Sequence, residues 1–286
     1  MDWKTEIEVA EAAARVGGAL AASRFQSGIV GGSKNATAEE GSFNIVTQAD
    51  LEAERAIVEE IHRTFPDHAV LGEEIYGGGD KTAETLASEH LWIIDPIDGT
   101  SNFFHGVPHF GVSVAYYHRG EAVCGVVGNP PRDEWFTAVR GQGAFQDGRR
   151  LSVAPSLRLD EVLVGFGYYY DRGAMMEATF DVVVELLRRK SHGVRRMGAA
   201  TLDLAYVATG AFGAFFEYEL SPWDFAAGRL IVEEAGGKIT TCYGDPLPLG
   251  KTSVLATNGP IHDEMVALLT EKFPRRSTDG VADPSD

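Results

Sequence analysis

The stretch Asp95-Pro96-Ile97-Asp98-Gly99-Thr100 indicates more about this chain than any other segment. It follows the apolar run of residues 91–94, which predicts a buried β-strand. Two carboxylates three residues apart, at the end of a strand, can converge on one hard cation, because such cations prefer oxygen ligands. Pro96 makes the turn rigid, and Gly99 lets the backbone approach a ligand closely. The stretch therefore predicts the floor of a metal-assisted phosphate site, although these residue types also favour an ordinary turn.

The overall composition narrows the class of protein and its partners. The chain has 286 residues, enough for one large domain or two modest ones, and 44% of them are hydrophobic, as in a soluble globular protein. Its formal net charge of −17 argues against a nucleic-acid polymer or an anionic membrane as partner. The same charge opposes a phosphate ester, unless bound divalent cations reverse the local electrostatics.

The cysteines and the hydropathy pattern indicate the compartment. Cys124 and Cys242 imply no disulfide framework, and neither begins the Cys-x5-Arg phosphate loop of a thiol-based phosphatase. No signal peptide is visible, and no apolar stretch approaches membrane-spanning length. We therefore expect a protein of the reducing cytoplasm that does not engage a membrane.

Helical and strand patterns alternate along the chain. Thr5-x-x-Glu8 resembles a capping box that opens a helix to about Ser23. Thr47-x-x-Asp50 opens a second helix, and the Gly- and Ser-rich residues 31–42 between the two predict a mobile loop. The buried stripe of that second helix is predicted to be Ala53, Ile57, Ile61 and Phe65. Further strands are predicted at 110–117, 121–128, 135–138, 161–166, 193–196, 211–217, 237–241 and 252–257, and further helices at 176–190, 199–209, 223–235 and 260–272. This interleaving, with a hairpin in the middle, predicts an α/β chain with mixed sheets.

Two further acidic motifs lie beside apolar segments. Leu71-Gly72-Glu73-Glu74 ends an apolar run, and ligand-binding groups gather at strand ends in α/β proteins, although a glutamate pair is usually a solvated surface feature. Ser221-Pro222-Trp223-Asp224 opens an apolar helix, where the commoner role of an aspartate is that of a cap. If Glu73, Asp95, Asp98 and Asp224 gather in one place, their mutual repulsion raises their pKa values and a divalent cation removes that repulsion. The set therefore predicts a metal site.

The order of these motifs resembles that of the inositol monophosphatase family. Gly72-Glu73-Glu74, Asp95-Pro96-Ile97-Asp98-Gly99-Thr100 and Trp223-Asp224-x-Ala226-Ala227-Gly228 occur in the family's order, with Gly141-Gln142-Gly143-Ala144-Phe145 between them. The resemblance runs from roughly residue 5 to residue 270. It implies a layered α/β/α/β/α sandwich, a magnesium-dependent phosphatase, sensitivity to lithium and a homodimer.

The resemblance also assigns metal ligands by motif position. It implies that Glu73, Asp95 and the carbonyl of Ile97 bind a first Mg²⁺. Asp95, Asp98 and Asp224 would bind a second Mg²⁺, so that Asp95 bridges the two ions. The implied halves are residues 1–155, which carry most of these ligands, and residues 156–273, which supply Asp224 and substrate contacts; residues 274–286 are expected to be a disordered tail.

Catalytic and substrate-binding roles follow from the same resemblance. Glu73 and Thr100 would orient a metal-activated water, without a covalent intermediate. Asp50 matches an acidic residue near the metals, and its local alternative is a carboxylate in the first turn of a helix. The amides of Gly99 and Thr100 would hold phosphate oxygens. Remaining substrate contacts are expected from Gly198, Ala199, Ala200 and Glu217, the last of which could equally be a rim charge. Lys34, in the loop, could close over the phosphate, although loop lysines are usually just solvated.

Three alternatives to an inositol monophosphatase stay open at this point. Asp98-Gly99-Thr100-Ser101-Asn102-Phe103 resembles the inositol-type branch, whereas other branches hydrolyse histidinol phosphate, fructose bisphosphate or adenosine bisphosphate. A haloacid-dehalogenase-type phosphatase needs Asp-x-Asp, but here the spacing is three and Pro96 intervenes. A non-catalytic regulatory binding module could keep the fold, although the intact acidic set argues against it.

Overall fold

The computed structural model describes residues 3–27, 32–33, 45–46, 48–74, 82–168 and 172–275. Lys34, most of the expected loop at residues 31–42, and the expected tail from residue 276 onward lie outside the described residues. Thr47, the expected cap of the second helix, also lies outside them.

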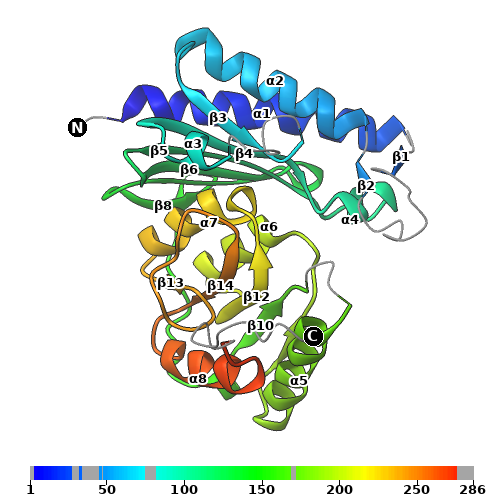
Figure 1. Ribbon diagram of the computed structural model, residues 1–286, viewed down its shortest axis with the longest axis vertical. Helices are drawn as coiled ribbons and strands as arrows, with labels where there is room; N and C mark the ends of the chain where they lie inside the picture. Colours follow the sequence, from blue (N-terminus) through cyan, green and yellow to red (C-terminus); the bar gives the residue numbers. More distant parts are fainter. Residues whose placement is uncertain are drawn as a thin grey trace, which may run out of the picture.

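The elements stack in five layers, which alternate between helices and sheets (Figure 1). Helices α1 (Lys4–Ser27) and α2 (Gln48–Thr64) cover the outer face of the first sheet. Helices α6 (Ala200–Ala208) and α7 (Pro222–Glu234) lie between the two sheets, and α5 (Ala174–Arg188) and α8 (His262–Lys272) cover the outer face of the second. Two short helices, α3 (Thr82–Leu86) and α4 (Thr100–Phe104), flank a central strand of the first sheet. The expected α/β/α/β/α sandwich is confirmed.

Both large sheets are mixed, as expected. The first has the order β3-β4-β5-β6-β7-β8-β9, in which β3 and β4 are parallel and the other neighbours are antiparallel. Its strands are β3 (Ala69–Gly72), β4 (His90–Asp98), β5 (Gly111–His118), β6 (Glu121–Asn129), β7 (Glu134–Val139), β8 (Gly143–Gln146) and β9 (Arg149–Arg150). The second has the order β11-β10-β12-β14-β13, with β10 parallel to both of its neighbours. Its strands are β10 (Leu163–Phe166), β11 (Gly193–Arg195), β12 (Ala214–Leu220), β13 (Lys238–Thr240) and β14 (Thr252–Thr257). A separate short pair joins β1 (Gly32–Ser33) to β2 (Ile45–Val46).

The second helix shows how the apolar pattern becomes packing. Ala53, Ile57 and Ile61 are completely buried on α2, where their spacing places them on one face toward the first sheet. Phe65 follows the end of the helix and packs, partly buried, against the same apolar cluster. The predicted stripe is therefore confirmed.

Strand β4, next to the edge strand β3, is buried on both faces. Leu91 and Ile93 belong to the apolar cluster between the sheets, whereas Trp92 and Ile94 belong to the cluster under α1 and α2. Successive side chains of a strand point to opposite faces, and both faces of this sheet are covered by helices. A continuous apolar run is the consequence, which is why residues 91–94 show no alternation.

The structure corrects the expected end of this strand. β4 does not stop at Ile94 but continues to Asp98, with a break in register. Asp95 pairs with Ser113 and Asp98 pairs with Gly111, so three steps along β4 correspond to two along β5. The extra residue is a β-bulge, a feature that turns side chains away from the regular alternation.

The largest apolar core is shared by the two halves of the chain. Leu91 on β4, Phe225 on α7 and Val254 on β14 belong to one cluster of buried residues. The strands of the first large sheet come before residue 155 in the sequence, and those of the second come after it. Helices α6 and α7 also come after residue 155, but they pack against the first sheet. None of the helices within the described ranges is long and apolar enough to span a lipid bilayer.

Candidate functional site

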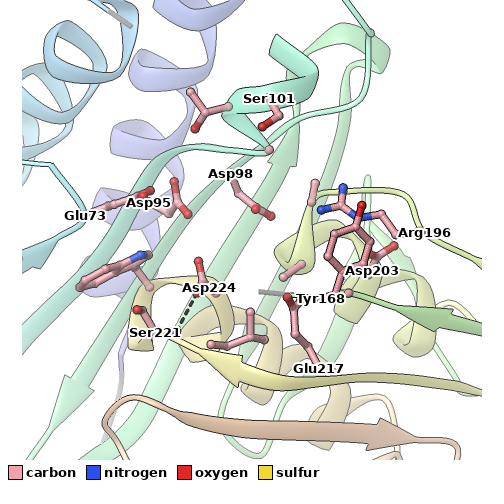
Figure 2. A pocket seen from close by; sticks show the side chains of 18 residues that line it. Glu73, Asp95, Asp98, Ser101, Tyr168, Arg196, Asp203, Glu217, Ser221 and Asp224 are labelled. Atoms are coloured by element: carbon pink, nitrogen blue, oxygen red, sulfur yellow. Dashed lines mark hydrogen bonds between the residues drawn. The ribbon is translucent and has the colours of Figure 1, made fainter. Parts of the chain in front are cut away.

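A pocket lies where the bulged end of β4 meets α6, α7 and the end of β12 (Figure 2). Its volume of about 270 Å³ is at the lower limit for small-molecule pockets, which suits a single small ligand. Arg196 is the single basic side chain among the described residues that line it. Its acidic lining residues are Glu73, Asp95, Asp98, Asp203, Glu217 and Asp224.

The bulge explains how Asp95 and Asp98 reach the same pocket. In a regular strand a spacing of three residues would direct two side chains to opposite faces of the sheet. The extra residue between Asp95 and Asp98 cancels this alternation, and both side chains line the pocket. Figure 2 shows the two carboxylates on the same side of the strand.

Three carboxylates form the centre of the site. One oxygen each from Asp95, Asp98 and Asp224 lies within 4.8 Å of the others. Each of the three is also oriented by a backbone amide: Asp95 Oδ1 accepts a hydrogen bond from the N–H of Ile97 at 3.0 Å, Asp98 Oδ2 accepts one from Thr201 at 2.7 Å, and Asp224 Oδ2 accepts one from Ser221 at 2.7 Å. The Thr201 hydroxyl donates a further hydrogen bond to Asp98 Oδ2 at 2.6 Å.

Asp224 combines the two roles that the sequence left as alternatives. It lies in the first turn of α7 and closes a capping box with Ser221, which precedes the helix. The same side chain lines the pocket beside Asp95 and Asp98. The cap therefore fixes the orientation of a carboxylate that belongs to the site.

Burial and mutual repulsion disfavour the charged state of these carboxylates. Burial raises the pKa of Asp95 well above its usual value, and the charges of Glu73 and Asp98 add to the effect. Burial likewise raises the pKa of Asp224, with the charge of Asp98 as the next cause, and that of Asp98, where the hydrogen bonds from Thr201 oppose the change. A divalent cation among these oxygens would restore the charged form, and an all-oxygen donor set suits a hard ion. The residues therefore fit a metal site.

Glu73 and the neighbouring β3 end lie beside this centre. Glu73 lines the pocket next to Asp95, as Figure 2 shows, and its charge is the second cause of the raised pKa of Asp95. The completely buried carboxylate of Glu54 accepts a hydrogen bond from the N–H of Glu74 at 2.8 Å, which anchors the segment that carries Glu73. The sequence did not indicate this anchoring role of Glu54.

Thr100 links two other predicted residues. Its hydroxyl lies 3.1 Å from the carbonyl oxygen of Ile97 and 3.4 Å from Oδ1 of Asp50, which is completely buried on α2. Thr100 lines the pocket, whereas Asp50 and Ile97 lie behind its wall. Asp50 is a carboxylate in the first turn of α2 and also lies close to the site, because this turn of the helix packs against Thr100.

The predicted substrate contacts also line the pocket. Gly99, Gly198, Ala199, Ala200 and Glu217 all face the pocket. Gly99 has φ +89°, and a Cβ at that position would lie 2.9 Å from the carbonyl oxygen of Gly198. The close approach of these two segments therefore requires glycine. Glu217 is buried, which raises its pKa to about 8, while Arg196 opposes the change.

Comparison with known proteins agrees with this geometry. Residues 2–275 match the model of the inositol monophosphatase family. An inositol-1-monophosphatase from Rhizobium meliloti is 41% identical over 236 residues, which cover 82% of this chain and 86% of that protein. A protein named Nus factor SuhB from Pseudomonas aeruginosa is 40% identical over 239 residues, with 82% and 86% covered. The solved structure of an extragenic suppressor protein suhB from Bartonella henselae superposes with a TM-score of 0.83 at 34% identity, over 93% of this chain and 99% of that one.

The chain belongs to the inositol monophosphatase family. Members of this family are phosphomonoester hydrolases and depend on metal ions, so the chain is a phosphatase. The thiols of this family member cannot serve as nucleophiles, since Cys124 and Cys242 are buried away from the pocket and burial raises the pKa of Cys242 to about 12.

Several residues of the site escaped the sequence reasoning. Arg196 extends over the pocket and lies 5.0 Å from the ring of Tyr168, which also lines it. Asp203 is buried with Oδ1 lacking a hydrogen-bond partner, and burial raises its pKa well above the usual value. Asn102 donates hydrogen bonds to the carbonyls of His109 and Met197, which ties α4 to the segment before α6. A lone carboxylate in the otherwise apolar helix α6 was the available signal for Asp203.

Proposed function

We propose that this phosphatase hydrolyses a small alcohol phosphate monoester, with inositol monophosphate as the first candidate. The observation that carries the proposal is the set of three carboxylates, one oxygen from each within 4.8 Å of the others, in a pocket sized for one small ligand. We further propose Mg²⁺ as the metal, because every donor in the set is a hard oxygen and no imidazole or thiolate lines the described pocket.

The carboxylates have a positioning role in this proposal. Asp95, Asp98 and Asp224 would hold the metal together with Glu73 and the carbonyl of Ile97. When bound, Mg²⁺ would counter the charge that develops on the phosphoryl oxygens and lower the pKa of a water molecule. The amide hydrogen bonds to Asp95, Asp98 and Asp224 keep these carboxylates in place, so that little reorganisation is needed when the ligand arrives.

Glu73 and Thr100 act on the attacking water. The carboxylate of Glu73 would accept a proton from it, and the Thr100 hydroxyl would orient it. Asp50 supports Thr100 from behind, at 3.4 Å from its hydroxyl oxygen, and thus influences the direction of that hydroxyl. No protein nucleophile is required, so no covalent phosphoenzyme forms.

Glu217 and Asp203 would bind the hydroxyl groups of a polyol substrate. Both are buried carboxyl groups on its lining, and carboxyl oxygens accept hydrogen bonds from vicinal hydroxyls. The amides of Gly99 and Thr100 would hold the phosphate. Gly198, Ala199 and Ala200 are small lining residues and leave room for a ring.

Arg196 favours a second candidate substrate, a sugar bisphosphate such as fructose bisphosphate. A guanidinium group pairs well with a phosphate, and this one lies at the pocket with the ring of Tyr168 beneath it. Histidinol phosphate and adenosine bisphosphate stay further candidates. A regulatory binding role has one point of support, the Nus factor name of the Pseudomonas aeruginosa relative.

The location and the assembly are proposals of the same kind. Two free, buried cysteines suit a reducing cytoplasm. We propose a homodimer, supported by the exposed side chains of Phe180, Val184 and Leu187, which follow one face of α5. A sedimentation experiment that shows only monomer would contradict the dimer.

Phosphate release with a substrate panel tests the activity. We expect release from inositol monophosphate in the presence of Mg²⁺, inhibition by Li⁺, and none from the Asp95→Asn variant. Arg196→Gln separates the two substrate candidates, because it should weaken turnover of fructose bisphosphate more than that of inositol monophosphate. If the wild type releases no phosphate from any sugar, polyol or nucleotide substrate, the binding role replaces the catalytic one.

A further inference from the structure

Imidazole rings gather at the end of β4 that lies far from the pocket. His90 begins β4, and its ring stacks on the ring of His68. The two ring centroids lie 4.4 Å apart, with an angle of 5° between the ring planes. The ring of His118 lies on the other side of His90 at 4.9 Å. The ring centroids of His118 and of Trp3, the residue directly ahead of α1, lie 5.5 Å apart, so the cluster adjoins the start of that helix.

Strand pairing holds His90 and His118 together. They are direct partners across the antiparallel pair of β4 and β5. Glu89 precedes His90, and its carbonyl accepts a hydrogen bond from the N–H of Arg119 at 2.8 Å, which closes the end of the ladder. One ligand atom each from Glu89, His90 and His118 lies within 4.8 Å of the others.

The hydrogen bond of His90 suits a histidine that coordinates a metal ion through its other ring nitrogen. His90 Nδ1 lies 2.6 Å from the hydroxyl oxygen of Tyr116. A histidine that binds a metal usually donates its other N–H to an oxygen, which fixes the ring orientation. Tyr116 can accept that N–H and leave Nε2 of His90 as the ligand nitrogen.

The Nδ1 atom of His118 lacks the hydrogen bond that a buried ring nitrogen usually makes. It is buried and has no hydrogen-bond partner. A buried polar atom without a partner is uncommon in folded proteins, and an ion bound at the site is one physical reason for it.

We propose that Glu89, His90 and His118 bind a transition-metal ion, with Zn²⁺ as the first candidate. Two imidazoles and one carboxylate form a donor set that zinc accepts, whereas Mg²⁺ and Ca²⁺ prefer oxygen alone. Asp95 lies five positions after His90, which corresponds to about 17 Å along β4. The ion is therefore separate from the metal of the phosphatase pocket.

The site lies at the end of the ladder between β4 and β5. An ion at Glu89, His90 and His118 links the segment before β4 to the end of β5. Trp3 packs on His118 and Tyr116, so the ion also steadies the ring surface on which the start of α1 lies. Its role is structural, and catalysis does not need it.

Arg119 competes with the ion for Glu89. Its Nε and Nη2 atoms both donate to Oε1 of Glu89, at 3.1 and 2.7 Å. Half of the Glu89 side chain is exposed, so it has the freedom to turn toward the histidines. Arg119 itself adopts φ +52°, a conformation that asparagine tolerates well, so Arg119→Asn removes the competing charge without backbone strain.

Zinc binding to the full-length protein tests the proposal. The Asp95→Asn background and excess Mg²⁺ remove the contribution of the carboxylate pocket, and Zn²⁺ binding is measured by equilibrium dialysis and by calorimetry. We expect one Zn²⁺ per chain, affinity at least tenfold weaker in Glu89→Gln and in His118→Gln, and several-fold tighter in Arg119→Asn. Circular dichroism verifies that each variant is folded.

An exposed histidine elsewhere provides the matched control. His192→Gln removes an imidazole from the second half of the chain and should leave zinc binding unchanged. Binding of Co²⁺ gives an independent readout, since its visible absorption reports nitrogen and oxygen coordination. This absorption should vanish in His118→Gln and persist in His192→Gln. Equal zinc affinity in wild type, Glu89→Gln and His118→Gln, or an absence of zinc binding in the Asp95→Asn background, would overturn the proposal.

Discussion

The two ends of β4 hold opposite chemistry on one strand. At the carboxyl end, Asp95 and Asp98 are buried among other carboxylates and face a pocket. At the amino end, His90 lies half-buried between two other imidazoles. The donor set of the first end suits a hard cation bound through oxygen, and that of the second suits a softer cation bound through nitrogen. The pairing with β5 is regular from His90 to Asp95 and bulged between Asp95 and Asp98, so the local pairing and the surrounding elements determine the difference.

Burial shifts proton affinity in opposite directions at the two ends. It raises the pKa of Asp95, where Glu73 adds repulsion, and it lowers the pKa of His68, where His90 adds repulsion. In both places the neutral form is favoured, because a low-dielectric surrounding penalises charge of either sign. At the carboxylate end a bound cation would have to displace protons, whereas at the imidazole end the neutral rings can bind a cation directly.

Removing the carboxylate of Asp95 should give the largest effect. Asp95→Asn should lower kcat/KM for phosphate release by more than about a thousandfold, since it removes a ligand charge from the site. Without metal the variant should be at least as stable as wild type, because one of the repelling charges is gone. Steady-state kinetics and urea unfolding in EDTA measure both.

A change at the other end of β4 serves as the control for Asp95→Asn. His90→Gln should retain phosphate release within about threefold, because the imidazole cluster takes no part in catalysis. A comparable loss of activity in His90→Gln would show that the two ends are coupled and would end the distinction between them.

Asp224 offers a second, smaller test. Asp224→Asn keeps an oxygen that can accept the hydrogen bond from Ser221, whereas Asp224→Ala loses it. Both variants should lose about a hundredfold in kcat, and the alanine variant should also lose about 1 kcal/mol of unfolding free energy. If Asp224→Asn unfolds as readily as Asp224→Ala, charge rather than the cap stabilises the start of α7.

The sequence predicted the carboxylate end much better than the imidazole end. Asp95, Asp98 and Asp224 lie in contiguous motifs whose residue types have a shared chemical use, and their positions along strands and helices follow from the apolar runs. His90 and His118 form no motif, since they are brought together only by the pairing of β4 with β5. Register of that kind depends on the whole sheet and is not visible in a local pattern.

Details within the predicted site also depended on tertiary structure. The β4 bulge is a property of the pairing with β5, so the strand was expected to end at Ile94. Asp203 and Arg196 reach the pocket from segments whose local patterns predict a helix over 199–209 and a strand over 193–196, and neither pattern indicates a site. Only the packing of α6 against the bulge turns them into parts of the site.

The pH dependence of stability should distinguish the carboxylate end in the metal-free protein. The pKa of Glu217 is about 8 in the folded state, against an ordinary value of 4.5, so the folded chain holds a proton that the unfolded chain lacks between these two pH values. Its contribution to stability is complete below pH 4.5 and is lost as the pH rises through 8. Glu217→Gln should flatten this fall by on the order of 3 kcal/mol.

Urea unfolding in EDTA at several pH values measures the effect of Glu217. His68 gives the opposite sign, because its lowered pKa means that stability is lost as the pH falls below 6.5. The control is His68→Gln, which should leave the slope between pH 7 and 8 unchanged. An identical slope in Glu217→Gln and wild type would mean that Glu217 is ionised in the folded protein.

Two glycines with the same backbone conformation give the finest comparison of the two ends. Gly99 precedes α4 at φ +89°, and Gly120 lies in the turn between β5 and β6 at φ +77°. Alanine at either position suffers the left-handed strain of roughly 1–2 kcal/mol. At Gly120 a Cβ meets nothing within 4 Å, whereas at Gly99 it meets the Gly198 carbonyl at 2.9 Å.

Gly99→Ala should therefore lower the free energy of unfolding, measured in urea, by about 1 kcal/mol more than Gly120→Ala does. Only Gly99→Ala should also reduce phosphate release, because the Gly198 segment that lines the pocket must shift. Equal costs at both positions would show that this segment gives way freely and that the substrate wall is not rigid.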